Sequence, residues 1–154
     1  MITWDEFWSL ISTLDGRAEQ DRCARLSEAL ARRPVHEITG FGERLAEALY
    51  RLDREEFGLL PVTGMGSPDD PFPQSADVFL YSRCAVVAAG RHAYDSVADH
   101  PLRFAPFTAP ELDGEWLLYV APRAHQQTTG RAWDQRTRFC FESYSNRDGW
   151  PRHR

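Results

Sequence analysis

Arg83 is the residue whose surroundings most strongly suggest chemistry. It lies between Leu80-Tyr81 and the apolar run 84–89, in a stretch that is apolar nearly all round when drawn as a helix. An enclosed guanidinium must be paired or hydrogen-bonded, because an isolated buried charge is strongly destabilising. Arg83 therefore either locks helices together through internal contacts, extends its head to the surface, or grips a carboxylate or phosphate at a pocket floor. Internal contacts are the favoured interpretation.

His92, Asp95 and Asp99 have side chains of the types that bind metals, and helical spacing places them on one face. A metal needs further ligands, and the sequence contains no His-Glu-x-x-His or similar pattern to supply them. We expect an exposed helix end here and no metal site.

Nucleophilic and cofactor chemistry have little support. Cys84 lies in an apolar run, which is typical of an inert buried thiol, and there is no Gly-x-Ser-x-Gly elbow. All 18 basic residues are arginine. The absence of lysine rules out a Schiff-base lysine with pyridoxal phosphate and the phosphate-binding lysine of a P-loop. We expect no cofactor.

A polar and aromatic segment, 142–150, closes the chain. Its residues Ser145, Asn146 and Asp148 suit a tight turn, and Trp150 is expected to cover that turn or the core. The segment is either a structural plug, which is favoured, or a contact for a ligand.

Helices must position these residues. Thr3 and Glu6 form a capping box ahead of an apolar stripe, which predicts a helix over about 4–15. Apolar periodicity predicts further helices over about 18–33, 34–53 and 76–98, and the last should run through the centre of the fold. Glycines and prolines predict a loop over 58–75. The apolar run 116–120 predicts a short strand, and Phe139 and Phe141 on one side predict a second over 138–144, within a C-terminal α/β segment spanning 111–150.

We therefore predict one mainly α domain over 1–154: a helical bundle around a central buried helix (76–98), with a small C-terminal two-stranded β element. The net charge of −5 argues against nucleic-acid and anionic-membrane partners. The tail 123–154 nevertheless has seven arginines against three acidic residues. Three dispersed cysteines, no long apolar run and no signal peptide favour a soluble cytoplasmic protein.

The chain resembles the bacterial domain-of-unknown-function family 4240. The resemblance rests on Asp5-Glu-Phe-Trp8, on the central piece 75–90, on Leu117-Leu-Tyr-Val-Ala-Pro122 with Thr129-Gly130, and on Ser145-Asn-Arg-Asp-Gly-Trp150. It implies a shared fold and a bacterial cytosolic protein, and it implies no activity.

Three functions remain open. The first is a non-catalytic binding or regulatory protein that recognises a protein partner or a small anion. Its binding residues would be Asp77, Arg83, Glu142, Asn146 and Trp150. The alternative is a small lysine-independent enzyme with a site around Asp77, Arg83, His92 and Glu142, covered by a lid at 58–74. Small size and acidity alone suggest a third option, an immunity-type protein that neutralises a toxin.

Overall fold

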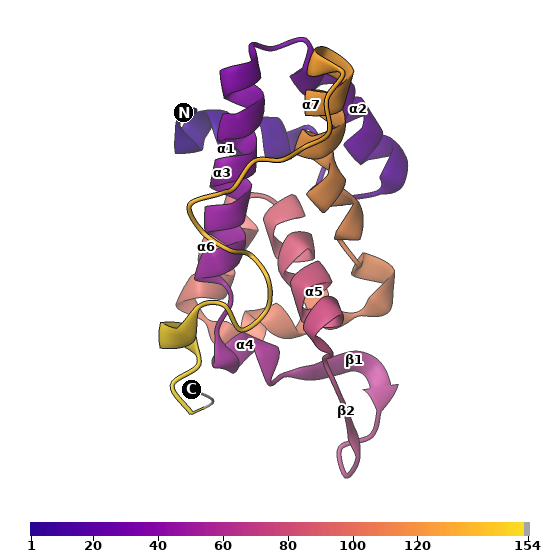
Figure 1. Cartoon of the computed structure of the whole chain (residues 1–154). Coiled ribbons are helices and arrows are strands. Elements are labelled where there is room, and N and C mark those ends of the chain that lie inside the picture. The colour runs from indigo at the N-terminus through magenta and orange to yellow at the C-terminus, as the bar shows by residue number, and fades with distance from the viewer. Residues whose placement is uncertain (153–154) are drawn as a thin grey trace.

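The chain folds mainly into helices that surround a hydrophobic core, which confirms the predicted class (Figure 1). The computed structural model describes residues 1–152. The α-helices and strands are α1 (Trp4–Ser12), α2 (Gln20–Ala31), α3 (Val35–Arg51), α4 (Glu55–Gly58), β1 (Pro61–Gly66), β2 (Pro71–Pro73), α5 (Ala76–Ala88), α6 (Arg91–Asp99) and α7 (Val120–Thr129). Short 3₁₀ helices are η1 (Pro101–Thr108), η2 (Pro110–Leu112), η3 (Glu115–Tyr119) and η4 (Arg147–Gly149).

The first helix begins where its capping box predicts. The Thr3 hydroxyl accepts from the Glu6 backbone N–H at 3.1 Å, and the Glu6 carboxylate accepts from the Thr3 N–H at 2.7 Å. These bonds satisfy backbone donors that a helix start leaves free. The face that follows is buried and includes Phe7, Trp8 and Ile11, so the aromatic stripe belongs to the core.

The predicted central helix is present but consists of two helices. Gly90 has φ +105°, a conformation that other residues adopt only with strain, and it separates α5 from α6. Nearly every residue of α5 from Phe79 to Ala88 is buried, because α3, α6, η1 and η3 all pack against it. The prediction of one continuous helix over 76–98 is therefore wrong, although helices do occupy these positions.

The long helix α3 is, with α5, one of the two helices on which the rest of the fold packs. Helix α7 packs against both α2 and α3, so the C-terminal half of the chain returns to the N-terminal helices (Figure 1). After α7 the chain runs back along α3 as an irregular segment and reaches the opposite end of the molecule, near α4.

The predicted C-terminal strands are wrong. Residues 115–119 form η3, and no strand is assigned between 130 and 152. The two-stranded antiparallel sheet lies instead within the predicted loop 58–75, where β1 pairs with β2 in a hairpin that projects from the body (Figure 1). The Thr63 N–H donates to the Thr108 hydroxyl at 2.7 Å, which fastens β1 to η1. Proline occupies two of the three positions of β2.

Within residues 1–152, none of the helices has the length and apolar composition needed to cross a membrane.

Candidate functional site

Arg83 is fully buried and connects three parts of the chain. Its Nη1 donates to the Leu49 carbonyl of α3 at 2.9 Å, and its Nη2 donates to the Ser143 hydroxyl at 2.9 Å. The guanidinium also lies over the Phe79 ring, 4.6 Å from the ring centre, a distance at which cation–π attraction operates. Arg83 therefore joins α5 to α3 and to the C-terminal segment. This is the internal role that the sequence favoured.

Burial also sets the electrostatics of Arg83. Desolvation lowers the pKa of its guanidinium, while the negative charges of Asp53 and Glu142 act in the opposite direction. Its Nε lacks a hydrogen-bond partner among the described residues. The buried cation thus depends on a nearby buried anion, Asp53, for part of its compensation.

Asp53 holds the C-terminal segment in place. The residue is fully buried, and its two carboxylate oxygens accept three hydrogen bonds. Oδ1 accepts from the Tyr144 backbone N–H at 3.0 Å and from the Trp150 indole Nε1–H at 2.9 Å, and Oδ2 accepts from the Asn146 backbone N–H at 2.9 Å. All three donors lie in residues 143–150, which we call the C-terminal strap.

Further contacts fix the strap to the ends of α3 and α5. The Asn146 side chain donates to the Tyr50 carbonyl at 3.1 Å, and the Ser143 hydroxyl donates to the Ala76 carbonyl at 2.7 Å. A Cβ at Gly149 would overlap the Asp53 carbonyl oxygen, so only glycine permits this approach. The strap is therefore a specifically bonded element despite having no regular structure before η4.

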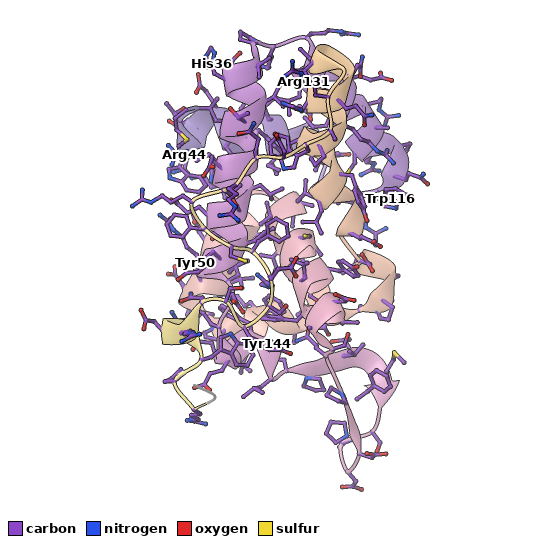
Figure 2. All side chains as sticks on the ribbon, in the orientation of Figure 1. His36, Arg44, Tyr50, Trp116, Arg131 and Tyr144 are labelled. Atoms are coloured by element: carbon purple, nitrogen blue, oxygen red, sulfur yellow. The ribbon has the colours of Figure 1, made fainter. Side chains whose placement is uncertain are left out.

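The strap forms one wall of a pocket of about 970 Å³, which we call the strap pocket. Further lining comes from the end of α4 and from the chain around β2, and Tyr144 lies at this end of the molecule (Figure 2). The lining residues are Gly58, Leu59, Pro73, Gln74, Tyr144, Arg147, Asp148 and Trp150.

Aromatic rings shape the strap wall. The Trp150 ring meets Tyr144 edge to face at 4.8 Å and Phe79 edge to face at 5.8 Å. Trp150 is 4% exposed, whereas Tyr144 is 49% exposed. A Cβ at Gly58 would overlap the Trp150 indole, so the missing side chain of Gly58 makes room for this ring.

Gln74 supplies a buried polar group to the other wall. It is 8% exposed, and its Nε2 donates to the Phe57 carbonyl at 2.9 Å and to the Leu60 carbonyl at 3.0 Å. Its Oε1 is buried and has no hydrogen-bond partner among residues 1–152. The lining thus includes a residue whose acceptor oxygen is unsatisfied but not exposed to the pocket.

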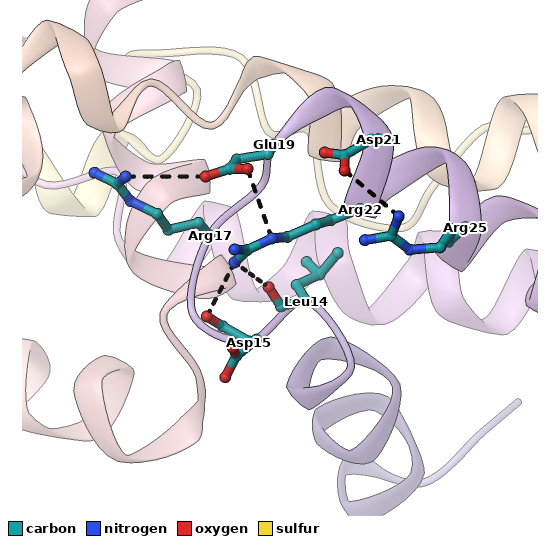
Figure 3. A network of polar contacts seen from close by, with 7 residues as sticks. All are labelled: Leu14, Asp15, Arg17, Glu19, Asp21, Arg22 and Arg25. Carbon is teal, nitrogen blue, oxygen red and sulfur yellow. Dashed lines mark hydrogen bonds and ion pairs between the residues drawn. The ribbon is translucent and has the colours of Figure 1, made fainter.

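A second pocket of about 230 Å³ lies beside the turn between α1 and α2. Arg22 stabilises this turn by donating to the Leu14 and Asp15 carbonyls, and it also pairs with Glu19 at 3.6 Å (Figure 3). Burial raises the pKa of the Asp113 carboxyl in the lining. The nearby carboxylates and arginines already form contacts with one another, which favours a structural role for the turn.

The structure brings together only some of the residues that the sequence singled out. Arg83, Asn146 and Trp150 meet through Asp53 and the strap, and Trp150 lines the strap pocket. Glu142 is exposed and acts on Arg83 only through its charge. Asp77, in the first turn of α5, is exposed, and no hydrogen bond or ion pair of its side chain is recorded in residues 1–152.

His92 is exposed on α6, and within the described part of the chain no three His, Cys, Asp or Glu side chains are grouped for a metal. The sequence did not reveal Asp53 or Gln74. A carboxylate at the C-terminal end of a helix, where the dipole is unfavourable, was the available signal for Asp53.

Comparison with known proteins gives one result. A family model described as "Protein of unknown function (DUF4240)" matches residues 2–127, most of the chain. The match includes α1 to α6 and most of α7, and it ends before the strap. No curated protein matches the chain. No solved structure matches it either.

Proposed function

The chain belongs to the DUF4240 family of proteins of unknown function, and we propose that it is a non-catalytic binding protein whose ligand occupies the strap pocket. The observation that carries the proposal is a pocket of about 970 Å³ lined by residues of the strap, of α4 and of the chain around β2. Ligand sites in proteins usually enclose roughly 300–1,000 Å³ and combine apolar lining with a few polar groups.

Both walls are built in advance of binding. Asp53 holds Tyr144, Asn146 and Trp150 on one side. The Gln74 side chain is held by the Phe57 carbonyl of α4 and by the Leu60 carbonyl that follows this helix. A site whose walls are already ordered loses little entropy when a ligand arrives, which favours affinity.

The composition of the lining favours recognition over catalysis. Leu59, Pro73 and Trp150 give the lining much of its apolar surface. Its polar groups come from Gln74, Tyr144, Arg147 and Asp148, and none of them is a histidine or a cysteine. Trp150 keeps the binding role predicted from the sequence. Arg83 and Asn146 act indirectly by fixing the strap, and Asp77 and Glu142 remain predictions with no contact that ties them to the pocket.

The enzyme alternative needs Asp77, Arg83, His92 and Glu142 to act together. In the described chain Arg83 is engaged by Leu49 and Ser143, while His92 lies exposed on α6. The proposed lid 58–74 contains a hairpin that is fastened to η1. These contacts favour the binding function.

The occupant is either a small molecule or a side chain of a protein partner, and both would use the same pocket. Cys23 and Cys84 are free and buried and Cys140 is free and exposed, which supports placing the protein in a reducing cytoplasm.

A fragment screen followed by protein-observed NMR tests the proposal. We expect bound fragments to shift the backbone amides of Leu59, Gln74 and Tyr144. Leu59→Trp fills the pocket from a residue that is 56% exposed and should abolish these shifts. Leu102→Trp is the matched control, because Leu102 is 78% exposed and lies on η1 outside the pocket lining. Fragments that bind only elsewhere on the protein, or whose amide shifts persist in Leu59→Trp, would overturn the proposal.

A further inference from the structure

Exposed apolar side chains gather at the end of the molecule that carries the strap pocket. Eight large apolar residues are exposed in the described chain, and four of them lie here. Leu59 and Tyr144 line the pocket, and Met65 and Phe72 lie on the projecting hairpin of β1 and β2. A gathering of this kind is typical of a surface that another molecule covers.

The hairpin is an ordered projection. At its tip the Ser67 N–H donates to the Asp70 carbonyl at 3.0 Å, and the Asp70 N–H donates to the Ser67 carbonyl at 3.1 Å. At its base the Thr63 hydroxyl donates to the Ala105 carbonyl of η1 at 2.6 Å. An element that is already ordered loses little entropy when it docks, which favours association.

The hairpin and the strap pocket lie next to each other. Pro73, the last residue of β2, lines the pocket, whereas Phe72 is 46% exposed and lies outside the lining. The hairpin projects from this end of the molecule (Figure 1). A two-fold axis that brings the hairpin of one molecule to the pocket of a second therefore brings the second hairpin to the first pocket.

The pocket suits an aromatic side chain as its occupant. Its volume of about 970 Å³ exceeds what one ring needs. Leu59 is 56% exposed and Tyr144 is 49% exposed, so both present apolar surface against which a further ring can pack.

Charge favours a second copy of the chain as the partner. Asp69 and Asp70 at the hairpin tip are exposed, and no basic residue occurs in 59–75. The pocket lining contains Arg147, from a segment, 123–154, with seven arginines against three acidic residues. A guanidinium has five N–H donors, so Arg147 can bind a carboxylate of the second copy while it keeps its own contacts.

From these observations, and resting on the proposed function, we propose that the partner in the strap pocket is a second copy of this chain. In the resulting two-fold dimer, Phe72 of each molecule packs against Leu59 and Tyr144 of the other. The acidic hairpin tip then lies toward Arg147. The occupant enters the pocket as it stands, and neither wall has to move.

Analytical ultracentrifugation of the full chain tests the proposal. We expect a monomer–dimer equilibrium whose dissociation constant rises at least about tenfold in Phe72→Ser, because the change removes an aromatic anchor from both contacts. Val35→Ser is the matched control. Val35 is 40% exposed and lies at the start of α3, at the end of the molecule opposite the hairpin (Figure 1), so the constant should stay within about twofold.

A mixing experiment identifies the two contacting surfaces. Leu59→Trp fills the pocket and leaves the hairpin intact, whereas Phe72→Ser leaves the pocket intact. An equimolar mixture should form a heterodimer that retains one of the two contacts, and it should associate at least about tenfold more tightly than either variant alone. Circular dichroism checks that both variants fold. If one does not, isotope-filtered NMR contacts between Phe72 of one unaltered molecule and Tyr144 of another decide the question.

The outcomes separate the two proposals. A chain that stays monomeric at about 1 mM, or a dimer that neither Phe72→Ser nor Leu59→Trp weakens, overturns the second-copy inference. If fragments nevertheless enter the pocket of the Phe72→Ser chain, the binding function stands without it. If no fragment enters that pocket and no dimer forms, the proposed function and the inference are overturned together.

Discussion

The buried carboxylate of Asp53 accepts the indole N–H of Trp150 at 2.9 Å across 97 positions of sequence. The same oxygen accepts from the Tyr144 backbone, and the other oxygen accepts from Asn146. One side chain at the end of α3 thus orders both aromatic residues of the strap pocket. The stability of the strap and the existence of the pocket consequently depend on the same carboxylate.

Replacing Asp53 should release the strap. Asp53→Ala leaves three buried donors unpaired and removes the negative charge that acts most strongly on Arg83, so we expect the free energy of unfolding to fall by about 3–5 kcal/mol. Denaturant unfolding measures this loss. Asp95→Ala, at an exposed position on α6, is the control and should change stability by less than about 0.5 kcal/mol. Similar losses in the two variants would contradict the role given to Asp53.

Arg83→Met tests whether the buried arginine supports the structure. The change leaves the Leu49 carbonyl without its donor and removes the Arg83 bond to Ser143, so we expect a loss of about 2 kcal/mol or more in unfolding free energy. Hydrogen exchange should also quicken at strap amides. Arg25→Met is the matched control, since Arg25 forms only an exposed pair with Asp21, and it should be nearly neutral. Unchanged stability in Arg83→Met would show that its internal bonds contribute little.

Gly58→Ala should displace Trp150, because the added methyl group would occupy the position of the indole. We expect the indole N–H signal of Trp150 to move and its exchange with solvent to quicken by about tenfold or more, since the bond to Asp53 is strained or broken. Two-dimensional NMR of the tryptophan side chains measures both effects. Glu56→Ala changes an exposed residue of the same helix and should leave this signal in place.

The buried thiol of Cys23 predicts a loss of stability in alkaline solution. Burial raises its pKa from 9.0 to about 11, so the folded chain retains a proton that the unfolded chain releases. The stabilising contribution is complete below pH 9.0 and disappears as the pH rises to about 11. Unfolding free energies measured across this window should fall less steeply in Cys23→Ala than in the unaltered chain. Parallel slopes would show that Cys23 does not titrate differently in the two states.

The helices were predictable because their signals are local. The capping box of Thr3 and Glu6 gives the start of α1, and the apolar run around Arg83 identifies the most buried helix. The separation of α5 from α6 was missed, because a glycine within an apolar pattern does not show from sequence alone that it adopts φ +105°.

The strands were mispredicted because short apolar segments do not distinguish a strand from a helical turn. Residues 116–120 form a short apolar run that fits a strand or a buried helix, but η3 packs against α2 and α5, and tertiary contacts determine the outcome. Near 138–144 no partner strand is present in the described chain. Side chains satisfy the backbone there instead, as when Glu43 accepts from the Arg138 N–H at 3.0 Å.

The pocket was beyond prediction because its parts are distant in sequence. Gln74 and Trp150 line the same pocket only after α3, α4 and the strap are assembled, and no local pattern connects them. The sequence predicted a tight turn near Asn146 and Gly149, but it did not predict that this turn packs against Asp53.

The prolines of the projecting hairpin have a consequence for self-association. Pro71 and Pro73 carry no amide hydrogen, so the outer rim of β2 cannot serve as a template for a strand from another molecule. The opposite side of β1 is occupied by Thr108. The hairpin extends into solvent and carries the half-exposed ring of Phe72. Because both of its edges are blocked, we expect it to resist pairing with other molecules into fibrils.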